Sequence, residues 1–284
     1  TYLINLSEAT DFIHYTLDLD QIIVDKGLSY SDDFQLRFYQ DGDYDNRGFV
    51  FDDIQVMTSG EDLFGAQVIS QTPTGTLDGP VSSVEVTFSE PIGSFPLDQV
   101  TITGPIGNAI EPTSVTTTDD LTWTVTFAPQ GLPGVYRLEL GPQILDAAPQ
   151  ANPMNQDGDW INGETSDTYQ GSFAIAAAPV NSYPFLEDFE AGAIGGLGAY
   201  WGFETQGTGR VQGTAGQNPR GSYQLELSQT DYGTNHAAAI LHLDLLDGVT
   251  PASGVTVDFY EKVFGSGSSN YAALYLRSSS EDTW

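Results

Sequence analysis

The stretch Val84-Glu85-Val86-Thr87-Phe88 decides the fold class, because apolar and polar side chains alternate along it. The same alternation returns from Leu121 to Phe127 and from Tyr136 to Leu140. In a strand, successive side chains point to opposite faces, so this alternation gives one apolar face that is buried and one polar face in water. We therefore predict half-buried antiparallel strands through the middle of the chain.

These strands belong to one complete sandwich. Gly- and Pro-containing turns separate the alternating runs, for example at Asp78-Gly79-Pro80 and Pro133-Gly134. About seven short strands at this spacing are typical of an immunoglobulin-like β-sandwich. We expect them near Val68, Val84, Val100, Val115, Val125, Leu138 and Phe173.

Composition narrows the class of function. The 284 residues include 39 acidic and 8 basic side chains, giving a net charge of -31, and no cysteine. Such a field repels nucleic acid and anionic membranes, whereas it suits divalent cations or a salty extracellular medium. No apolar run approaches the roughly 20 residues of a membrane helix. Solubility alone is an equally good explanation of the charge, and the absence of cysteine does not fix the compartment. We predict no nucleic-acid partner and no membrane insertion.

The two ends of the chain read as parts of another domain. Residues 1–60 hold about four strand-like runs and a short helical turn from Gln21 to Lys26. These are too few strands to close a core alone, and we expect them at Tyr2–Leu6, Phe12–Leu19, Phe34–Tyr39 and Phe49–Val56. Residues 179–284 resume strands between Gly-rich breaks, expected at Phe185–Phe189, Tyr200–Phe203, Ser222–Leu227, Ala237–Leu243, Val255–Val263 and Tyr271–Arg277. We thus divide the chain into 1–60, an immunoglobulin-like sandwich at 61–178, and 179–284. Placing Trp284 before Thr1 gives an uninterrupted strand-turn-strand passage, and the joined ends match a jelly-roll sandwich in size.

Two resemblances agree with this division. Phe185-Leu-Glu-Asp-Phe-Glu190 resembles the opening of MAM-like or concanavalin-like jelly-roll modules, and Phe51-Asp-Asp-Ile54 resembles their closing strand. The stretches Gly79–Ile92 and Asn152–Tyr169 resemble the bacterial Ig-like domains of giant secreted surface proteins. The resemblance implies an all-β protein that is secreted and is extracellular or at the cell surface. In this chain the closing jelly-roll motif precedes the opening one.

We interpret the chain as one period of a repeating polymer. The part at 179–284 is then completed by residues 1–60 of the next copy, so that copies of the same chain are its partners. Closure of the jelly roll within one chain is the rival interpretation, and an arbitrary fragment is the third. Two links of about eight residues reach about 25 Å, which strains closure within one chain but allows it.

The sharpest local motif is an acidic loop that we predict to bind structural Ca²⁺. Oxygen-bearing side chains recur at alternate positions in a Gly-containing loop, and calcium takes six to eight oxygen ligands. The alternative is a solvated acidic turn. The predicted ligands are Asn155, Asp157, Asp159, the Ile161 carbonyl, Glu164 and Asp167, with Asp146 and Asn152 nearby.

Two further acidic groups are weaker metal candidates. Glu187 or Asp188 would meet Asp52 or Asp53 if the first and last jelly-roll strands are adjacent, and the resemblance implies a structural calcium there. The other group lies in a strand-connecting loop, and an exposed hairpin tip explains it better than a calcium site does. It comprises Asp41, Asp43 and Asp45.

Enzyme signatures are missing from the sequence. Glu187 and Asp188 are adjacent, so a strand would point them to opposite faces, unlike the same-side carboxylate pair of a retaining glycosidase. We predict a non-enzymatic structural protein that forms a fibre, stalk or surface layer stabilised by calcium. The alternative is a carbohydrate-binding or adhesion module with a polysaccharide partner, whose candidate aromatics are Tyr200, Trp201, Tyr232, Tyr271 and Tyr275.

Overall fold

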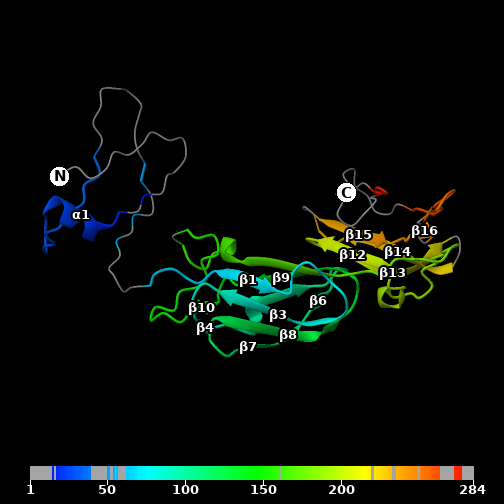
Figure 1. Ribbon diagram of the computed structural model, residues 1–284, viewed down its shortest axis with the longest axis horizontal. Helices are drawn as coiled ribbons and strands as arrows, with labels where there is room; N and C mark the ends of the chain where they lie inside the picture. Colours follow the sequence, from blue (N-terminus) through cyan, green and yellow to red (C-terminus); the bar gives the residue numbers. More distant parts are fainter. Residues whose placement is uncertain are drawn as a thin grey trace, which may run out of the picture. The chain divides into compact units, whose positions relative to one another are not determined.

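In the computed structural model the chain forms two compact units, Thr1–Val56 and Met57–Trp284. Figure 1 labels the helix α1 and most of the strands. The structure describes residues 15, 17–39, 50, 51, 54, 56, 62–159, 161–218, 221–231, 235–247, 250–262 and 272–276.

The first unit contains the helix α1, Leu19–Lys26. Asp18 caps its start by accepting a hydrogen bond from the Gln21 N–H at 2.9 Å, and Gly27 ends it in the left-handed conformation at φ 61°. The predicted helical turn at Gln21–Lys26 is therefore confirmed and begins two residues earlier. The strand expected over Phe34–Tyr39 is not formed in the structure.

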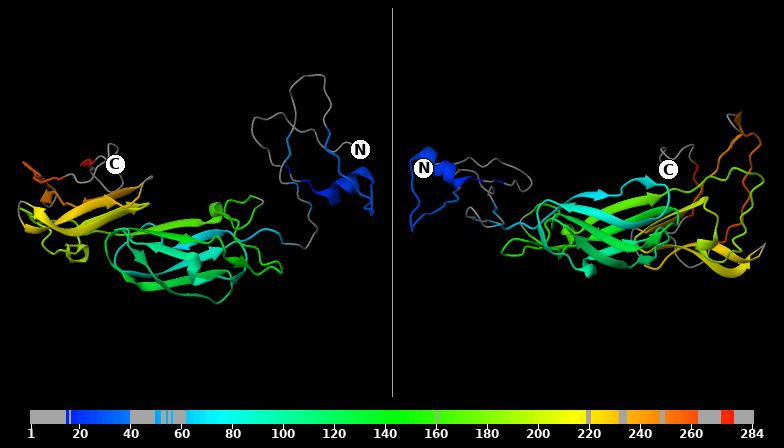
Figure 2. Two further views of the ribbon diagram at one scale, coloured as in Figure 1. Left: turned by 180° about the vertical axis from the view of Figure 1, so that it is seen from behind. Right: turned by 60° about the horizontal axis from the view of Figure 1, so that its bottom comes forward.

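Two sheets face each other in the middle of the second unit (Figures 1 and 2). The first has the order β1-β3-β8-β7 and is antiparallel. In the second, β9 lies between β5 and β11, and β2 adds to β11 in parallel. All seven expected strand positions fall within strands, so the all-β sandwich is confirmed. The strands of the first sheet are β1 Val68–Thr72, β3 Val81–Phe88, β7 Pro112–Thr117 and β8 Thr122–Gln130. Those of the second are β2 Thr76–Leu77, β5 Val100–Thr103, β6 Ala109–Ile110, β9 Gly134–Leu140 and β11 Tyr169–Ile175.

Short elements join these strands at the ends of the sandwich. The connector β4 pairs with β10, and a 3-10 turn precedes β11. Their bounds are β4 Ile92–Ser94, η1 Leu97–Gln99, β10 Leu145–Asp146 and η2 Thr165–Asp167.

The core lies between the two sheets and follows the alternation in the sequence. Val84, Val86 and Phe88 are at most 1% exposed, whereas Glu85 between them is exposed. Each such side chain contributes about 1.5 to 3 kcal/mol when fully buried. The apolar faces of the two sheets therefore account for the stability of the sandwich.

Tyr136 fixes the corner before β9. Its hydroxyl donates a hydrogen bond to the Leu132 carbonyl at 2.8 Å, and its ring stacks on Phe173 at 4.9 Å. Burial raises the pKa of Tyr136 to about 12. A tyrosine that bonds back to the backbone at this corner is a hallmark of immunoglobulin-type sandwiches.

The second sheet continues beyond the sandwich. Strand β12 meets β9 in parallel at Phe203 and Gly134, and β15 then pairs antiparallel with β12. Arg137 strengthens this junction, since its Nε donates to the Thr205 carbonyl at 2.9 Å. The remaining elements are η3 Ile194–Gly196, β12 Trp201–Gln206, β13 Gly209–Asn218, β14 Gly221–Gln229, β15 His236–Leu241, β16 Leu246–Asp247 and β17 Thr250–Pro251.

The C-terminal strands agree only partly with the sequence pattern. The strands expected at Tyr200–Phe203, Ser222–Leu227 and Ala237–Leu243 overlap β12, β14 and β15. No strand forms at Phe185–Phe189 or in the described residues 252–262 and 272–276. In the described part of the chain, no helix has the length and apolar character needed to span a membrane.

Candidate metal centre

The acidic loop from Asn155 to Asp167 connects β10 with β11. Gly158 and Gly163 adopt positive φ values of 76° and 80°, which let the chain fold back on itself. A Cβ at Gly163 would lie 2.7 Å from the Cβ of Pro153, so a larger residue does not fit there. These two glycines bring the acidic side chains of the loop toward one another.

Three of the predicted ligands, Asp157, Asp159 and Glu164, gather in this loop. One carboxylate oxygen from each lies within 4.8 Å of the others. The Asp159 N–H donates to Asp157 Oδ1 at 3.1 Å, and the Ile161 N–H donates to Asp159 Oδ1 at 2.6 Å. These local bonds hold the two aspartates at the loop's tip. The three carboxylates could hold a metal ion.

Asp167, another predicted ligand, is fully buried beneath the loop. Its Oδ1 accepts from the Asp157 N–H at 3.4 Å, and its Oδ2 accepts from the Glu164 N–H at 3.1 Å. Burial raises the pKa of the Asp167 carboxyl, and the nearby Asp157 charge adds to the effect, although the backbone N–H groups oppose it. Asp167 thus holds the loop backbone that carries Asp157 and Glu164.

Asn155 adds a buried oxygen to the loop. Its side chain is 1% exposed, and its Nδ2 donates to the Asp159 carbonyl at 2.7 Å. Among the described atoms, its Oδ1 has no hydrogen-bond partner. An unsatisfied buried oxygen costs about 1 to 3 kcal/mol, and such groups call for an explanation such as an ion. Coordination of a cation would satisfy this oxygen.

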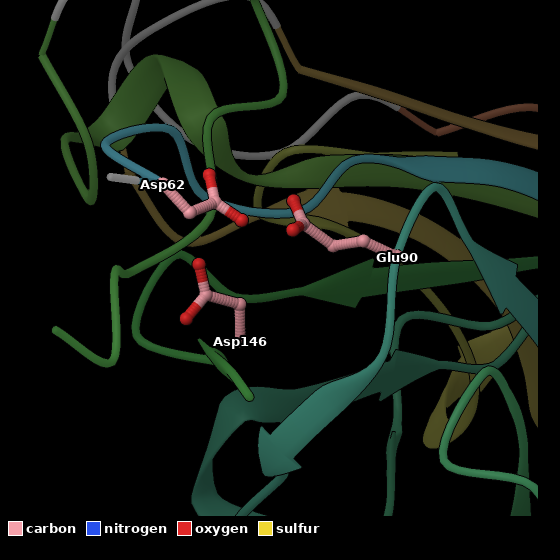
Figure 3. A group of neighbouring side chains, drawn as sticks. All are labelled: Asp62, Glu90 and Asp146. Atoms are coloured by element: carbon pink, nitrogen blue, oxygen red, sulfur yellow. The ribbon is translucent and has the colours of Figure 1, made fainter. Parts of the chain in front are cut away.

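Asp146 and Asn152, predicted as nearby ligands, bond to each other. The Asn152 backbone N–H donates to Asp146 Oδ1 and its Nδ2 to Asp146 Oδ2, both at 2.9 Å. Asp146 instead belongs to a second group of carboxylates with Asp62 and Glu90, whose oxygens also lie within 4.8 Å of one another. Figure 3 shows the three side chains converging from separate segments.

The sequence did not indicate Asp62 and Glu90, because their segments carry no metal-like spacing and meet only in the fold. Burial raises the pKa of Glu90 to about 7, helped by a hydrogen bond to Asp62 and by the charges of Asp62 and Asp146. Glu90 therefore keeps its proton to a higher pH than an ordinary glutamate does. Like charges at this distance disfavour simultaneous ionisation.

Glu187 and Asp188 make local hydrogen bonds. Glu187 accepts from the Phe189 N–H at 2.9 Å and from Trp201 Nε1 at 3.3 Å. Asp188 accepts from the Glu190 N–H at 3.1 Å. Their predicted partners Asp52 and Asp53 lie outside the described residues, as do Asp41, Asp43 and Asp45. Those two metal sites therefore stay predictions.

The candidate sugar-binding aromatics do not form a row among the described residues. Tyr200 packs edge-on against Phe185 at 5.3 Å, and Trp201 packs against Phe189 at 5.7 Å. Tyr275 is 54% exposed, while Tyr232 and Tyr271 lie outside the described part.

Comparison with known proteins gives few similarities. No family profile and no curated protein matches the chain. Solved structures of the bacterial S-layer protein SbsC are similar to it, each with a TM-score of 0.29. The N-terminal part of SbsC is 14% identical over 64% of this chain and 45% of its own length. Domains 1–6 of SbsC are 14% identical over 64% of this chain and 26% of that one. The chain thus spans less than half of either SbsC structure, and at this TM-score the similarity carries no argument about function.

Proposed function

We propose that this chain is a structural protein of an extracellular fibre, stalk or surface layer in which copies join head to tail. Residues of the first unit would complete the open sheet formed by the C-terminal strands of another copy, as in β-strand addition. Because such a joint uses two different surfaces, it does not close on itself and propagates.

One observation carries the proposal: each unit has a stretch in which exposed apolar side chains occupy alternate sequence positions, and these two stretches are called the apolar rows. Phe34, Leu36 and Phe38 occupy alternate positions in the first unit and are 37 to 51% exposed. Val255, Val257 and Phe259 do the same in the second unit and are 48 to 63% exposed. The structure assigns no strand to residues 34–39 or 255–259. Within the first unit, Phe34 contacts Tyr30 and Phe38 contacts Phe51, at ring-centroid distances of 5.4 and 4.7 Å. Large contiguous apolar patches are rare on soluble proteins and mark interaction surfaces where they occur.

The second unit also offers an edge for pairing. Among the described strands, β15 ends its sheet, with β12 as its neighbour. An unpaired strand edge is a template for another chain. Covering six half-exposed apolar side chains is worth roughly 5 to 9 kcal/mol, comparable with the lower part of the roughly 4 to 15 kcal/mol cost of association. Backbone hydrogen bonds would add about 0.5 to 1.5 kcal/mol each, so we expect assembly to increase with protein concentration.

Calcium is the proposed cation of the Asn155–Asp167 loop. The unpartnered Asn155 Oδ1 and the carboxylates of Asp157, Asp159 and Glu164 are hard oxygen ligands, which calcium prefers. The Ile161 carbonyl would complete the set. Binding would offset the repulsion among the three carboxylates, so the role of the ion is structural.

Light scattering of the intact chain over a range of concentrations tests the assembly. We expect masses at multiples of the 30.6 kDa chain that rise with concentration. A monomer mass at every concentration would instead favour closure within one chain.

Calorimetric titration with calcium tests the loop. The variant Asp159→Asn should weaken binding at least tenfold, since it removes one of the three charges. Asp78→Asn is the matched control, because Asp78 is an exposed acid in a turn outside both carboxylate groups. Equal affinity of wild type and Asp159→Asn would exclude this loop as the site.

A further inference from the structure

The acidic loop holds the chain segment that leads into β1, residues 63–68. Asn162 bonds to this segment twice: its Nδ2 donates to the Leu63 carbonyl at 2.7 Å, and its Oδ1 accepts from the Gly65 N–H at 3.2 Å. Gln156 also bonds twice, since its Oε1 accepts from the Val68 N–H at 2.8 Å and its Nε2 donates to the Val68 carbonyl at 3.3 Å.

Asn155 holds the same segment between these two anchors. Its backbone N–H donates to the Ala66 carbonyl at 3.2 Å, and its carbonyl accepts from Gln67 Nε2 at 2.8 Å. The backbones approach so closely that a Cβ at Gly65 would lie 1.5 Å from the Pro153 carbonyl oxygen. Ala66 is fully buried in the contact. The loop therefore acts as a clasp along the whole entry segment.

The anchors and the candidate ligands alternate within one short stretch. Gln156 precedes Asp157, and Asn162 lies between Asp159 and Glu164. A cation that holds the three carboxylates in place would therefore also hold in place Gln156 and Asn162, the two side chains that bond to residues 63–68. Without a cation, carboxylates about 5 Å apart repel by roughly 1 to 4 kcal/mol per pair, depending on the effective dielectric constant. The geometry of the clasp thus depends on the charge state of the loop.

We propose that cation binding by the Asn155–Asp167 loop fastens residues 63–68 onto the sandwich, and that loss of the cation releases them. The inference rests on the calcium site proposed above and assigns that site a second role. Residues 63–68 follow the boundary between the two units at Val56 and Met57. The cation would therefore control how firmly the connection between the units is held.

Hydrogen exchange on the intact chain, with calcium or with a chelator, tests the clasp. Calcium should slow exchange of the Gly65 and Val68 amides at least tenfold. Amides in the centre of β9, such as that of Leu138, serve as the internal reference and should change far less. Calorimetry on the same samples reports whether calcium binds.

Two variants separate the clasp from the site. Asn162→Ala and Gln156→Ala remove anchoring side chains without touching the three carboxylates. We expect both to bind calcium within about threefold of wild type, while the calcium-dependent protection of Gly65 is lost in the first and that of Val68 in the second. Circular dichroism confirms that each variant is folded, and either one alone suffices for the test.

The outcomes distinguish this inference from the proposed function. If calcium binds but exchange at Gly65 and Val68 is unchanged, the clasp is overturned and the metal site stands. If calcium does not bind at all, the metal site is wrong and the clasp is wrong with it. Full protection retained in both variants would also overturn the clasp.

Discussion

Individual residues in this chain are fixed by neighbours that are distant in sequence. Gly134 is the clearest case, because β12 approaches it so closely that a Cβ would lie 2.0 Å from the Phe203 carbonyl oxygen. Its φ of 133° also disfavours any residue with a side chain. The absence of a side chain at Gly134 is what lets β12 join the sheet.

Gly134→Ala should therefore destabilise the second unit by about 3 kcal/mol, from backbone strain and from the forced separation of β12. Urea unfolding measures the loss. Gly131→Ala is the matched control, since its nearest neighbour would be the Pro80 Cβ at 3.9 Å. Similar unfolding midpoints for the two variants would contradict the close approach.

Glu90 makes the stability of the second unit depend on pH. Its pKa is raised from 4.5 to about 7 in the folded state, so the folded protein binds this proton more tightly than the unfolded chain. The stabilisation is fully present below about pH 4.5 and is lost as the pH rises through about 7. Because the side chain is partly exposed and screened, we expect a loss of about 1 kcal/mol.

Glu90→Gln removes the titrating group, so the free energy of unfolding should change less with pH between about 4.5 and 7 in the variant than in wild type. Measured in the presence of a chelator, the variant should be more stable than wild type at pH 8 and equal to it near pH 5. A difference that is the same at both pH values would show that Glu90 does not titrate in this range.

At the scale of elements, local patterns were readable from the sequence and pairings between distant segments were not. The alternation through Val84 and Leu138 predicts β3 and β9, because a half-buried strand carries its own period. Strand β13 escaped prediction, since Gly209, Gly213 and Gly216 leave its alternation indistinct. The stretch Val255–Phe259 has the pattern of a strand but has no pairing partner in the described structure.

The candidate metal ligands also fall into those that the sequence indicated and those that only the fold brings together. Asp157, Asp159 and Glu164 lie within one loop, so their spacing alone indicated that they would meet. The group of Asp62, Glu90 and Asp146 comes from three separate segments (Figure 3), and only the fold brings them together. Asp167, which stays a predicted ligand, also accepts backbone hydrogen bonds with both of its oxygens, and the sequence did not indicate these bonds.

The corner between β8 and β9 provides a test at this scale. Tyr136→Phe removes the hydroxyl that bonds to the Leu132 carbonyl but keeps the ring stacked on Phe173. The partly buried Leu132 carbonyl loses a partner, so we expect a loss of about 1 kcal/mol in denaturant unfolding. Tyr169→Phe is the control, because its hydroxyl makes only a long contact of 3.4 Å with Gln71. If the two variants unfold alike, the corner hydrogen bond contributes little.

For the whole molecule, the acidic charge and the two apolar rows have opposite effects. A net charge of -31 keeps separate copies apart, while the rows around Leu36 and Val257 gain by being covered. Association should therefore strengthen with added salt, which screens the repulsion over about 10 Å at 0.1 M. Divalent cations that neutralise carboxylates would act in the same direction.

Head-to-tail joining makes a specific prediction for mixtures of variants. Leu36→Asp damages the row in the first unit, and Val257→Asp damages the row in the second. Because each joint needs one row of each kind, either variant alone should stay monomeric at concentrations where wild type assembles. Mixed together, the two variants retain one intact pair of rows, so they should form dimers and nothing larger. Light scattering distinguishes these masses, with Ile69→Asp as a control at an exposed apolar position on β1. Closure within one chain predicts monomers in every sample, and association through a single self-complementary surface predicts that one of the two variants still assembles alone.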